Sequence, residues 1–376
     1  MDVVSITQLI KNKAKDIGFD LIGVSPANSF PENQFYKEWL NKGFSGEMTY
    51  LERNSERRED IKQVLPDAKS VISCAMNYNT DYPYSSELSD KKKGWISRYA
   101  WGDDYHDTIK DKLQVLMDYI SSQLPQKVTS KIYVDTGPVL ERVYAKYAGI
   151  GWVGKNTCLI NQEIGSWLFI GEIISDIELD YDSPAPDRCG TCTRCIDACP
   201  TDAILEPYVL DSRLCISYLT IELKNKIPVG LRDGIQNNIY GCDICQDVCP
   251  WNKRASISDN QEFEPREDLY NPDLDNLSSL SPQEFRAMFK GSPIKRTKRR
   301  GLLRNVMIAM GNSGEKDFIL HIKECLQDEE PLVRAHAVWA LWKIEGAQSK
   351  ETLLSHRRAE NDMMVNDEID SILSSI

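Results

Sequence analysis

The sequence predicts three folded regions: an α+β region over residues 1–180, a small cysteine-rich domain over 181–258 and an all-α domain over 291–376, with a linker over 259–290. Three observations predict this division. Short β-type apolar runs alternate with helical patterns in the first region, eight of the 11 cysteines lie in the second, and a weak helical repeat occupies the end of the chain. At 376 residues the chain is also longer than one compact core usually is.

The composition is that of an ordinary globular protein, with 41% hydrophobic and 27% charged residues. No apolar run approaches the roughly 20 residues that a membrane-spanning helix needs. The first residues, Met-Asp-Val-Val-Ser-Ile-Thr, lack the basic start and apolar core of a signal peptide. We therefore expect a cytoplasmic protein that does not contact a membrane.

The first region contains apolar runs of both periods. Residues 6–17 have helical spacing and end at Gly18, which suits the left-handed residue that often follows a helix. Further patterns predict strands at 21–24 and 70–76, a helix at 105–124, a strand from 131, a helix at 139–148 and a strand at 167–179.

Asp135 stands where the strand that starts at Lys131 reaches a turn, just before the helix that starts at Val139. Two interpretations are open for its carboxylate. The side chain either caps the following helix, or it faces an apolar cavity that raises its pKa and makes it a proton donor near neutral pH.

Three other segments of the first region have both a structural and a ligand-binding interpretation. Arg57 and Arg58 lie on a solvated helix face or bind an anion, and the aromatic segment 95–106 packs at the edge of the core or lines a pocket for a large flat ligand. The segment 149–156, Gly-Ile-Gly-Trp-Val-Gly-Lys-Asn, is not a dinucleotide loop, because a helix precedes it and a strand follows it. Its glycines permit close approach of the backbone, and Lys155 suits an anionic or polar ligand.

The cysteines of the second region have the spacing of iron–sulfur ligands. Residues 189–200 read C-x2-C-x2-C-x3-C-P, the run of bacterial ferredoxins, in which the fourth cysteine binds the other cluster. A second run ends at Cys249-Pro250 but has Ile239 in place of its first cysteine, and Cys215 is the obvious replacement. Eight thiolates result, enough for two [4Fe–4S] clusters in a ferredoxin-like domain.

The crossing rule of this motif assigns the ligands of both clusters. One cluster is expected on Cys189, Cys192, Cys195 and Cys249, and the other on Cys199, Cys215, Cys242 and Cys245. Two zinc sites are the alternative, since C-x2-C pairs also bind zinc, but zinc needs neither the third cysteine nor the Cys-Pro ending. Disulfides fit less well, because nothing in the sequence indicates export.

The third region combines a basic segment with a weak repeat. The formal net charge of the chain is −12, yet residues 290–304 contain seven basic residues and no acidic one, which suggests a specific polyanionic partner. The segment from Arg304 resembles the one from Arg334, and the turn at Pro331 is typical of HEAT repeats. Two clusters that transfer electrons, an α+β region to receive them and this basic helical end together suggest a reductase of a polyanion, with tRNA or another nucleic acid the natural candidate.

Several stretches of the chain resemble epoxyqueuosine reductases, the family that completes queuosine synthesis on tRNA and is related in its core to reductive dehalogenases. The matching stretches, in chain order, are Trp-Gly-Asp-Asp-Tyr-His, Val-Asp-Thr-Gly-Pro, Gly-Ile-Gly-Trp-Val-Gly-Lys-Asn, both cysteine runs, Tyr-Gly-Cys-Asp-Ile-Cys-Gln-Asp-Val-Cys-Pro-Trp-Asn and Pro-Ile-Lys-Arg-Thr-Lys-Arg-Arg-Gly-Leu-Leu-Arg-Asn. They lie between about residues 57 and 305 and cover most of the chain.

The resemblance implies a cobalamin-binding catalytic core. Electrons from an external low-potential donor would pass through both clusters to cobalt, the epoxide of the modified wobble base would open, and loss of water would leave the alkene of queuosine. Asp135 matches the proposed general acid of the family, in a pocket apolar enough to keep a carboxyl protonated. The cobalt lower-ligand motif D-x-H-x-x-G fails, because Ile109 stands where it needs glycine after His106, so a corrin without a histidine lower ligand is expected.

The resemblance also assigns residues to the cofactor and to the RNA. The positions that match the cobalamin shell of the family are Arg58, Ser97, Asp135, Lys155, Asn156, Cys158, Ser217 and Thr220. The residues expected to contact tRNA phosphates, which position RNA without reading its sequence, are Lys295, Arg296, Lys298, Arg299, Arg300 and Arg304.

Other interpretations of the basic segment and of the whole chain are open. The alternative interpretation of the basic segment is a solvated charged loop that does not bind RNA. The chain is otherwise an iron–sulfur corrinoid reductase or electron-transfer protein that acts on a protein partner, or a reductive dehalogenase of a small molecule. We expect a monomer.

Overall fold

An antiparallel four-stranded sheet forms the centre of the first region in the computed structural model, which describes residues 3–374. Its strand order is β1-β2-β7-β4, with every neighbouring pair antiparallel. The strands are β1 (Leu21–Pro26), β2 (Ser70–Asn77), β7 (Leu168–Ser175) and β4 (Ser130–Tyr133). The predicted α+β character of this region is confirmed.

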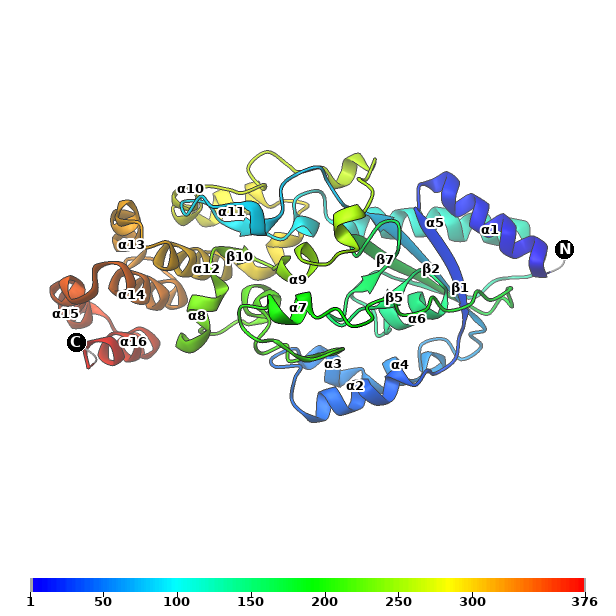
Figure 1. The fold of residues 1–376 in the computed structure, drawn as a ribbon, viewed down its shortest axis with the longest axis horizontal. Coiled ribbons are helices and arrows are strands. Elements are labelled where there is room, and N and C mark those ends of the chain that lie inside the picture. Colours follow the sequence, from blue (N-terminus) through cyan, green and yellow to red (C-terminus); the bar gives the residue numbers. More distant parts are fainter. Residues whose placement is uncertain (1–2, 375–376) are drawn as a thin grey trace.

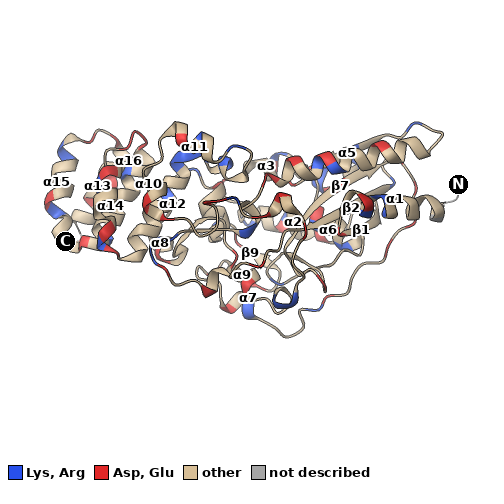
Figure 2. Ribbon diagram, turned by 90° about the horizontal axis from the view of Figure 1, so that it is seen from above, with Lys and Arg blue, Asp and Glu red and all other residues tan. Residues whose placement is uncertain are grey.

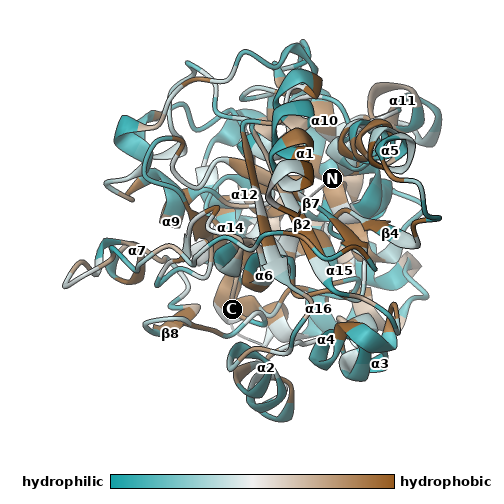
Figure 3. Ribbon diagram, turned by 90° about the vertical axis from the view of Figure 1, so that its right-hand side faces the viewer, coloured by the Kyte–Doolittle hydropathy of each residue, from teal (hydrophilic) through white to brown (hydrophobic). Residues whose placement is uncertain are grey.

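Helices cover both faces of this sheet. Helices α1 (Val3–Ile17) and α5 (Tyr105–Gln123) pack on one face, where Gly171 leaves room for Ile109 of α5. Helix α6 (Glu141–Tyr147) packs on the other face, on the opposite side of the strands in Figure 3. It approaches β1 closely, because a Cβ at Gly23 would lie 1.8 Å from the carbonyl oxygen of Ala148.

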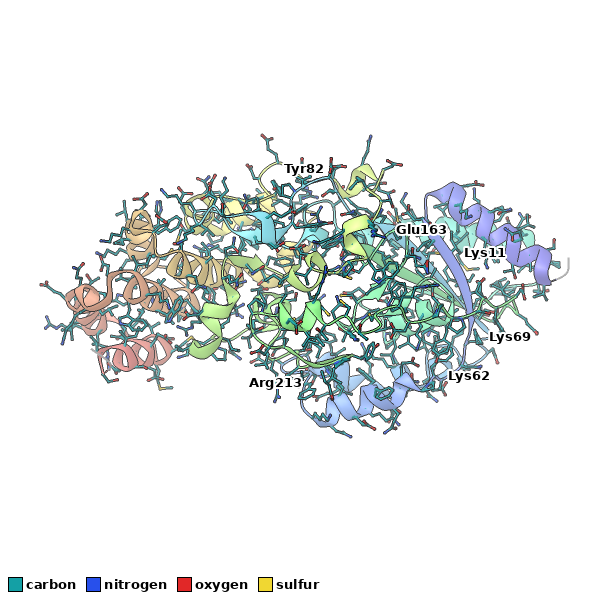
Figure 4. The ribbon with its side chains drawn as sticks, in the orientation of Figure 1. Lys11, Lys62, Lys69, Tyr82, Glu163 and Arg213 are labelled. Carbon is teal, nitrogen blue, oxygen red and sulfur yellow. The ribbon has the colours of Figure 1, made fainter. Side chains whose placement is uncertain are left out.

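Three short helices connect the sheet to the cysteine-rich region. They are α2 (Glu32–Asn41), α3 (Thr49–Arg53) and α4 (Ser55–Glu59). The indole N–H of Trp39 donates to the carbonyl of Leu210 at 2.6 Å, and the guanidinium of Arg213 lies over the ring of Phe44. Figure 4 shows Arg213 at this edge of the molecule, next to the connecting helices.

The cysteine-rich region consists of short elements at the centre of the molecule (Figure 1). In chain order these are α7 (Arg194–Asp197), β8 (Ile204–Glu206), β9 (Val209–Leu210), a π-helical turn η4 (Tyr218–Glu222), α8 (Val229–Ile235), β10 (Asn238–Tyr240) and α9 (Ile244–Asp247). Strand β10 pairs in parallel with β3 (Trp95–Ile96), and the hairpin of β5 (Trp152–Val153) and β6 (Leu159–Ile160) lies between the sheet and the cysteines.

Helices alone form the end of the chain. They are α10 (Leu274–Ser278), α11 (Pro282–Met288), the 3-10 turn η7 (Pro293–Thr297), α12 (Lys298–Ser313), α13 (Ile319–Cys325), α14 (Pro331–Glu345), α15 (Lys350–Ala359) and α16 (Met363–Leu373). Helix α12 from Gly301 to Gly311 and most of α14 up to Leu341 are buried, and the two helices pack closely, since a Cβ at Gly311 would lie 2.6 Å from the ring of Trp339. No helix in residues 3–374 is long and apolar enough to cross a membrane.

One apolar core joins these terminal helices to earlier parts of the chain. Trp95 and Trp101 are buried in it, so the first part of the aromatic segment packs in a core. Leu274 and Phe285 belong to the same core. The segment 259–290, expected to be a linker, is therefore folded against the helical region, because α10 and α11 each have an apolar face.

Candidate active site

Four cysteines surround one cavity of about 260 Å³ near the surface of the central region. They are Cys189, Cys192, Cys195 and Cys249, the set that the crossing rule predicts for one cluster. Burial, together with the negative charges of Cys249 and Cys189, raises the pKa of Cys195 to about 11, so the sulfurs of this group lie close together. The cavity and its four thiols fit a [4Fe–4S] cluster.

The other four cysteines, Cys199, Cys215, Cys242 and Cys245, form a second group. Burial raises the pKa of Cys242 well above its usual value, and the charges of Cys215 and Cys199 add to this shift. The hydrogen bond to Cys158 and burial raise the pKa of Cys245 well above its usual value, and the charges of Cys242 and Cys215 add to this shift. Cys215 therefore lies with the cysteines of the second run, in which Ile239 replaces the first cysteine. Within residues 3–374, no three His, Cys, Asp or Glu side chains converge closely enough to hold a single metal ion.

Backbone N–H groups point at the sulfurs of both groups. The amide of Ala203 donates to Sγ of Cys199 at 3.3 Å, and the amides of Ile244 and Trp251 donate to Cys242 and Cys249. Such bonds favour the thiolate over the thiol and tune the potential of a bound cluster.

The loop after β5 lies against both cysteine groups. The buried Lys155 ammonium donates to the carbonyls of Gly190 and Cys192 at 2.7 and 2.9 Å, so it fixes the first ligand loop. Asn156 donates to the carbonyl of Cys245, and the thiol of Cys245 donates to the sulfur of Cys158. The glycine loop therefore supports the cluster ligands directly.

Asp135 occupies a strained turn between β4 and α6. Its φ is +57°, in the left-handed region that few residues other than glycine adopt. Its backbone N–H donates to Oε1 of Glu141 at 2.6 Å, which holds the turn. The Asp135 carboxylate does not cap α6, whose first position follows Leu140 without a side-chain cap. Instead, about half of the side chain (48%) is exposed.

The Asp135 carboxylate faces two cationic groups. Its Oδ2 lies 3.3 Å from Nε2 of His106 and 3.6 Å from a guanidinium nitrogen of Arg296. The same Arg296 binds Glu222 at 2.9 Å. On its other side, Nδ1 of His106 lies 2.7 Å from Oδ1 of Asp104. A continuous polar chain thus joins the start of α5, the Asp135 turn and the basic segment.

These contacts set the charges of the site. Burial acts to raise the pKa of Asp135, but the hydrogen bond and charge of His106 and the charge of Arg296 lower it below its usual value. Burial acts to lower the pKa of His106, but its bonds to Asp104 and Asp135 raise it to about 9. At neutral pH the proton is therefore on His106. His106 and Arg296 thus favour the ionised form of Asp135, and its expected role as proton donor stays a prediction.

A second carboxyl beside Asp135 is neutral. Burial, followed by the negative charge of Asp135, raises the pKa of Glu141 to about 8. Sequence reasoning missed both Glu141 and His106. For His106 the sequence held one signal, the acidic residue Asp104 two positions earlier at the start of a helix, where a carboxylate caps α5 by accepting the N–H of His106.

The residues expected to contact cobalamin form two groups that differ in the exposure of their side chains. Asp135, Cys158 and Ser217 keep part of their side chains accessible. The other five, Arg58, Ser97, Lys155, Asn156 and Thr220, are buried and bonded within the protein.

The basic segment does not present six free cations. Arg304 is fully buried and donates to the carbonyls of Leu219, Leu223 and Asn225, so it cannot reach a phosphate in this structure. Arg299 is largely buried and paired with Asp328. This corrects the expectation for both residues: their side chains hold helices together.

The remaining basic side chains are accessible. Lys298 is exposed, Lys295 is 55% exposed beside Asp104, and Arg300 is 40% exposed with only a 4.0 Å contact to Glu330. Figure 2 shows Lys and Arg gathered near α11 and the start of α12. Arg296 is partly exposed but is shared between Asp135 and Glu222.

Two protein-family models match the chain. A model described as "4Fe-4S double cluster binding domain" matches residues 188–252, and one described as "Epoxyqueuosine reductase QueG, DUF1730" matches residues 58–136. With the cysteine geometry, the first match makes the chain an iron–sulfur oxidoreductase with two [4Fe–4S] sites.

Curated relatives specify the family. Epoxyqueuosine reductase of Leadbetterella byssophila is 46% identical over 299 residues, which cover 79% of this chain and 96% of the relative. That of Escherichia coli K12 is 38% identical over 342 residues, or 91% of this chain and 90% of the relative. The chain belongs to the epoxyqueuosine reductase family, and the reaction it catalyses is the reduction of epoxyqueuosine.

Solved structures agree over the full length. A crystal structure of epoxyqueuosine reductase with a tRNA-Tyr epoxyqueuosine-modified stem loop has a TM-score of 0.92 at 32% identity and covers 99% of both chains. A Bacillus subtilis epoxyqueuosine reductase, in which a catalytic loop named for an aspartate is swung out of the active site, has a TM-score of 0.90 at 31% identity and the same coverage.

Proposed function

We propose that this chain reduces epoxyqueuosine while the base is part of tRNA, using cobalamin, two [4Fe–4S] clusters and Asp135 as proton donor. The proposal rests on the contact between the acid and the basic segment. A guanidinium nitrogen of Arg296 lies 3.6 Å from the Asp135 carboxylate. A polyanion bound by the accessible lysines and arginines of this segment brings its modified base to the acid. The stem loop bound by a relative of the same fold supports this substrate.

The reaction needs two electrons and two protons. Cleaving both C–O bonds of the epoxide yields the alkene of queuosine and one water. An external low-potential donor supplies the electrons. The cavity of the first cysteine group is the entry, because it opens near the surface, and the second group follows it.

Cobalamin supplies a strongly reducing cobalt centre when it is bound. The residues fit it beside the second cysteine group: Cys158 bonds Cys245, Ser217 follows Cys215 closely, and Asp135 is accessible. We assign direct contact to these three residues. The five buried positions shape the walls, because their polar atoms are already engaged. His106 is held by two carboxylates, which agrees with a corrin that has no histidine lower ligand.

The helices α12 to α16 form a HEAT-like module in this proposal. Their packed pairs would present Lys298 and Arg300 at one end as a phosphate-binding surface. We propose that the chain acts as a monomer in the cytoplasm.

The deciding experiment uses the reduced, cobalamin-loaded protein and tRNA that contains epoxyqueuosine. Nucleoside analysis should show queuosine, and omission of cobalamin should prevent its formation. An unchanged nucleoside, with the added cobalamin still reduced by the clusters, would contradict the proposal. That outcome would favour a corrinoid-reducing or electron-transfer protein that serves another partner.

A further inference from the structure

We propose that His106 holds the proton that Asp135 delivers to the epoxide oxygen, and that Asp104 fixes the histidine for this task. The inference rests on the proposed function, because it takes Asp135 as the group that touches the substrate. His106 acts through Asp135 and is therefore a positioning and proton-storing residue.

The contacts of the imidazole ring define its protonation state. Nδ1 lies 2.7 Å from Oδ1 of Asp104, and Nε2 lies 3.3 Å from Oδ2 of Asp135. An ionised carboxylate only accepts hydrogen bonds, so two such contacts require an N–H on each ring nitrogen. A ring with two N–H groups is the imidazolium cation, which carries one transferable proton toward Asp135.

Asp104 is anchored from several directions. It is nearly buried, its Oδ1 accepts the backbone N–H of His106 at the start of α5, and its Oδ2 binds Nζ of Lys295 at 2.8 Å. Its backbone N–H donates to the carbonyl of Gly291. The carboxylate therefore cannot turn away from His106 without breaking the junction between α5 and the basic segment.

Stacked rings fix the plane of the imidazole. The His106 ring lies 4.1 Å from the ring of Tyr105, measured between centroids, and Tyr105 in turn stacks on Phe169 of β7 at 4.2 Å. With 23% of its side chain exposed, His106 can regain a proton from solvent.

Charged groups of four segments surround the histidine and its two carboxylates. They are Asp104 at the start of α5, Asp135 of the β4–α6 turn, Glu141 of α6, and Lys295 and Arg296 of η7. The two carboxylates in direct contact dominate and raise the pKa of His106 to about 9.

The protons and electrons balance as follows. The Asp135 carboxylate takes the Nε2 proton of His106 and passes it to the epoxide oxygen as a C–O bond of the epoxide breaks. The external donor provides two electrons through the clusters. Solvent returns one proton to His106, and the relay delivers it for the departure of water. The relay can deliver a proton only while the imidazole is protonated, so proton delivery is lost as the pH rises through about 9.

Single-turnover rates across pH 6–10 test the inference in the holoenzyme. The natural chain should slow tenfold per pH unit above about pH 9. The rate of His106→Gln should be lower by about 10²-fold or more at pH 7, and it should not show the decrease above pH 9. Its iron content, cobalamin spectrum and tRNA affinity should be unchanged. His321→Gln, a partly exposed histidine of α13, is the matched control and should behave as the natural chain.

A second readout does not depend on turnover. In the cobalamin-free protein, NMR of the His106 ring should show titration near pH 9, and Asp104→Asn and Asp135→Asn should each lower that midpoint. A midpoint near 6.5, or His106→Gln with the natural rate and pH profile, would overturn the inference while queuosine formation still supported the proposed function. Absence of queuosine with the natural chain would overturn the proposed function itself.

Discussion

At the scale of single residues, the catalytic turn combines strain with charge. Asp135 is held at a positive φ, which costs of order 1–3 kcal/mol, by the bond from its N–H to Glu141. The same turn places the carboxylate between His106 and Arg296. The strain is thus offset by contacts that aim the acid.

The variant Asp135→Asn removes the transferable proton but keeps the backbone geometry of the turn. Asparagine tolerates the left-handed conformation, so the turn should persist, but its amide cannot pass on a proton. We expect epoxide reduction to fall by about 10²–10⁴-fold, measured as queuosine formed in a single turnover. The cobalamin spectrum should be retained. Near-normal turnover would exclude the acid role.

The pKa of His106 also predicts a pH dependence of stability. Its value rises from about 6.5 in the unfolded chain to about 9 in the fold, so the native state binds the proton more tightly. The contribution of protonated His106 to the free energy of unfolding is fully present below about pH 6.5 and is lost as the pH rises through 9. The thermal midpoint of the natural chain, minus that of His106→Gln, should therefore decrease between pH 6.5 and 9. A constant difference would contradict the raised pKa.

At the scale of elements, one end of α12 divides its basic residues between the core and the surface. Lys298 and Arg300 face solvent, whereas Arg304, one turn further, lies inside. Because phosphate contacts release counterions, only the exposed residues should change the salt dependence of tRNA binding.

Charge reversal at Lys298 and Arg300 tests this division. The double variant to Glu should weaken tRNA binding and flatten its dependence on salt, because two cations near the phosphates are replaced by anions. Filter binding over a range of salt concentrations measures both. The control, Lys350→Glu with Arg358→Glu, makes the same charge change on exposed positions of α15 and should leave the affinity nearly unchanged. Equal weakening by both pairs would argue against a localised surface.

Cys215 offers a second test at this scale. Cys215→Ser should reduce the iron content from about eight to about four atoms per chain, since one [4Fe–4S] site loses a ligand. Cys325→Ser changes a buried thiol of α13 that bonds a carbonyl and should retain all of the iron. Full iron in Cys215→Ser would assign the ligand elsewhere.

The sequence predicted the elements better than it predicted the site. The helix at 105–124 and the strand at 70–76 follow from local periodicity, and the structure places them at Tyr105–Gln123 and Ser70–Asn77. Cysteine spacing likewise reflects a local loop geometry. The importance of His106 depends on Asp135 and on the basic segment, far away in the sequence. The burial of Arg304 was equally hidden, because it depends on carbonyls of the η4 segment.

At the scale of the whole molecule, buried polar contacts join the cluster region to the terminal helices. Arg232 of α8 makes two hydrogen bonds with Glu368 of α16, and both side chains are almost completely buried. The ring of His336 accepts the backbone N–H of Ile227 nearby. The terminal helices and the clusters are therefore parts of one cooperative structure.

Glu368→Gln tests that coupling. It removes the charge that neutralises Arg232, and breaking such a buried pair costs about 3–5 kcal/mol. The midpoint of thermal unfolding should fall, and release of iron should shift to lower temperature with it. Glu351→Gln, on exposed α15, should change neither. Early loss of helix without loss of iron would show that the two parts unfold separately.

The short helix α9 has a consequence for electron transfer. It contains Cys245, which belongs to the second cysteine group, and it ends two residues before Cys249, which belongs to the group around the outer cavity. Ligands of both clusters are thus attached to a single turn of backbone, and no hinge separates them. The tunnelling distance between the clusters is then fixed by covalent geometry. The hop between them should be insensitive to solvent viscosity, unlike the diffusional arrival of the donor and of tRNA.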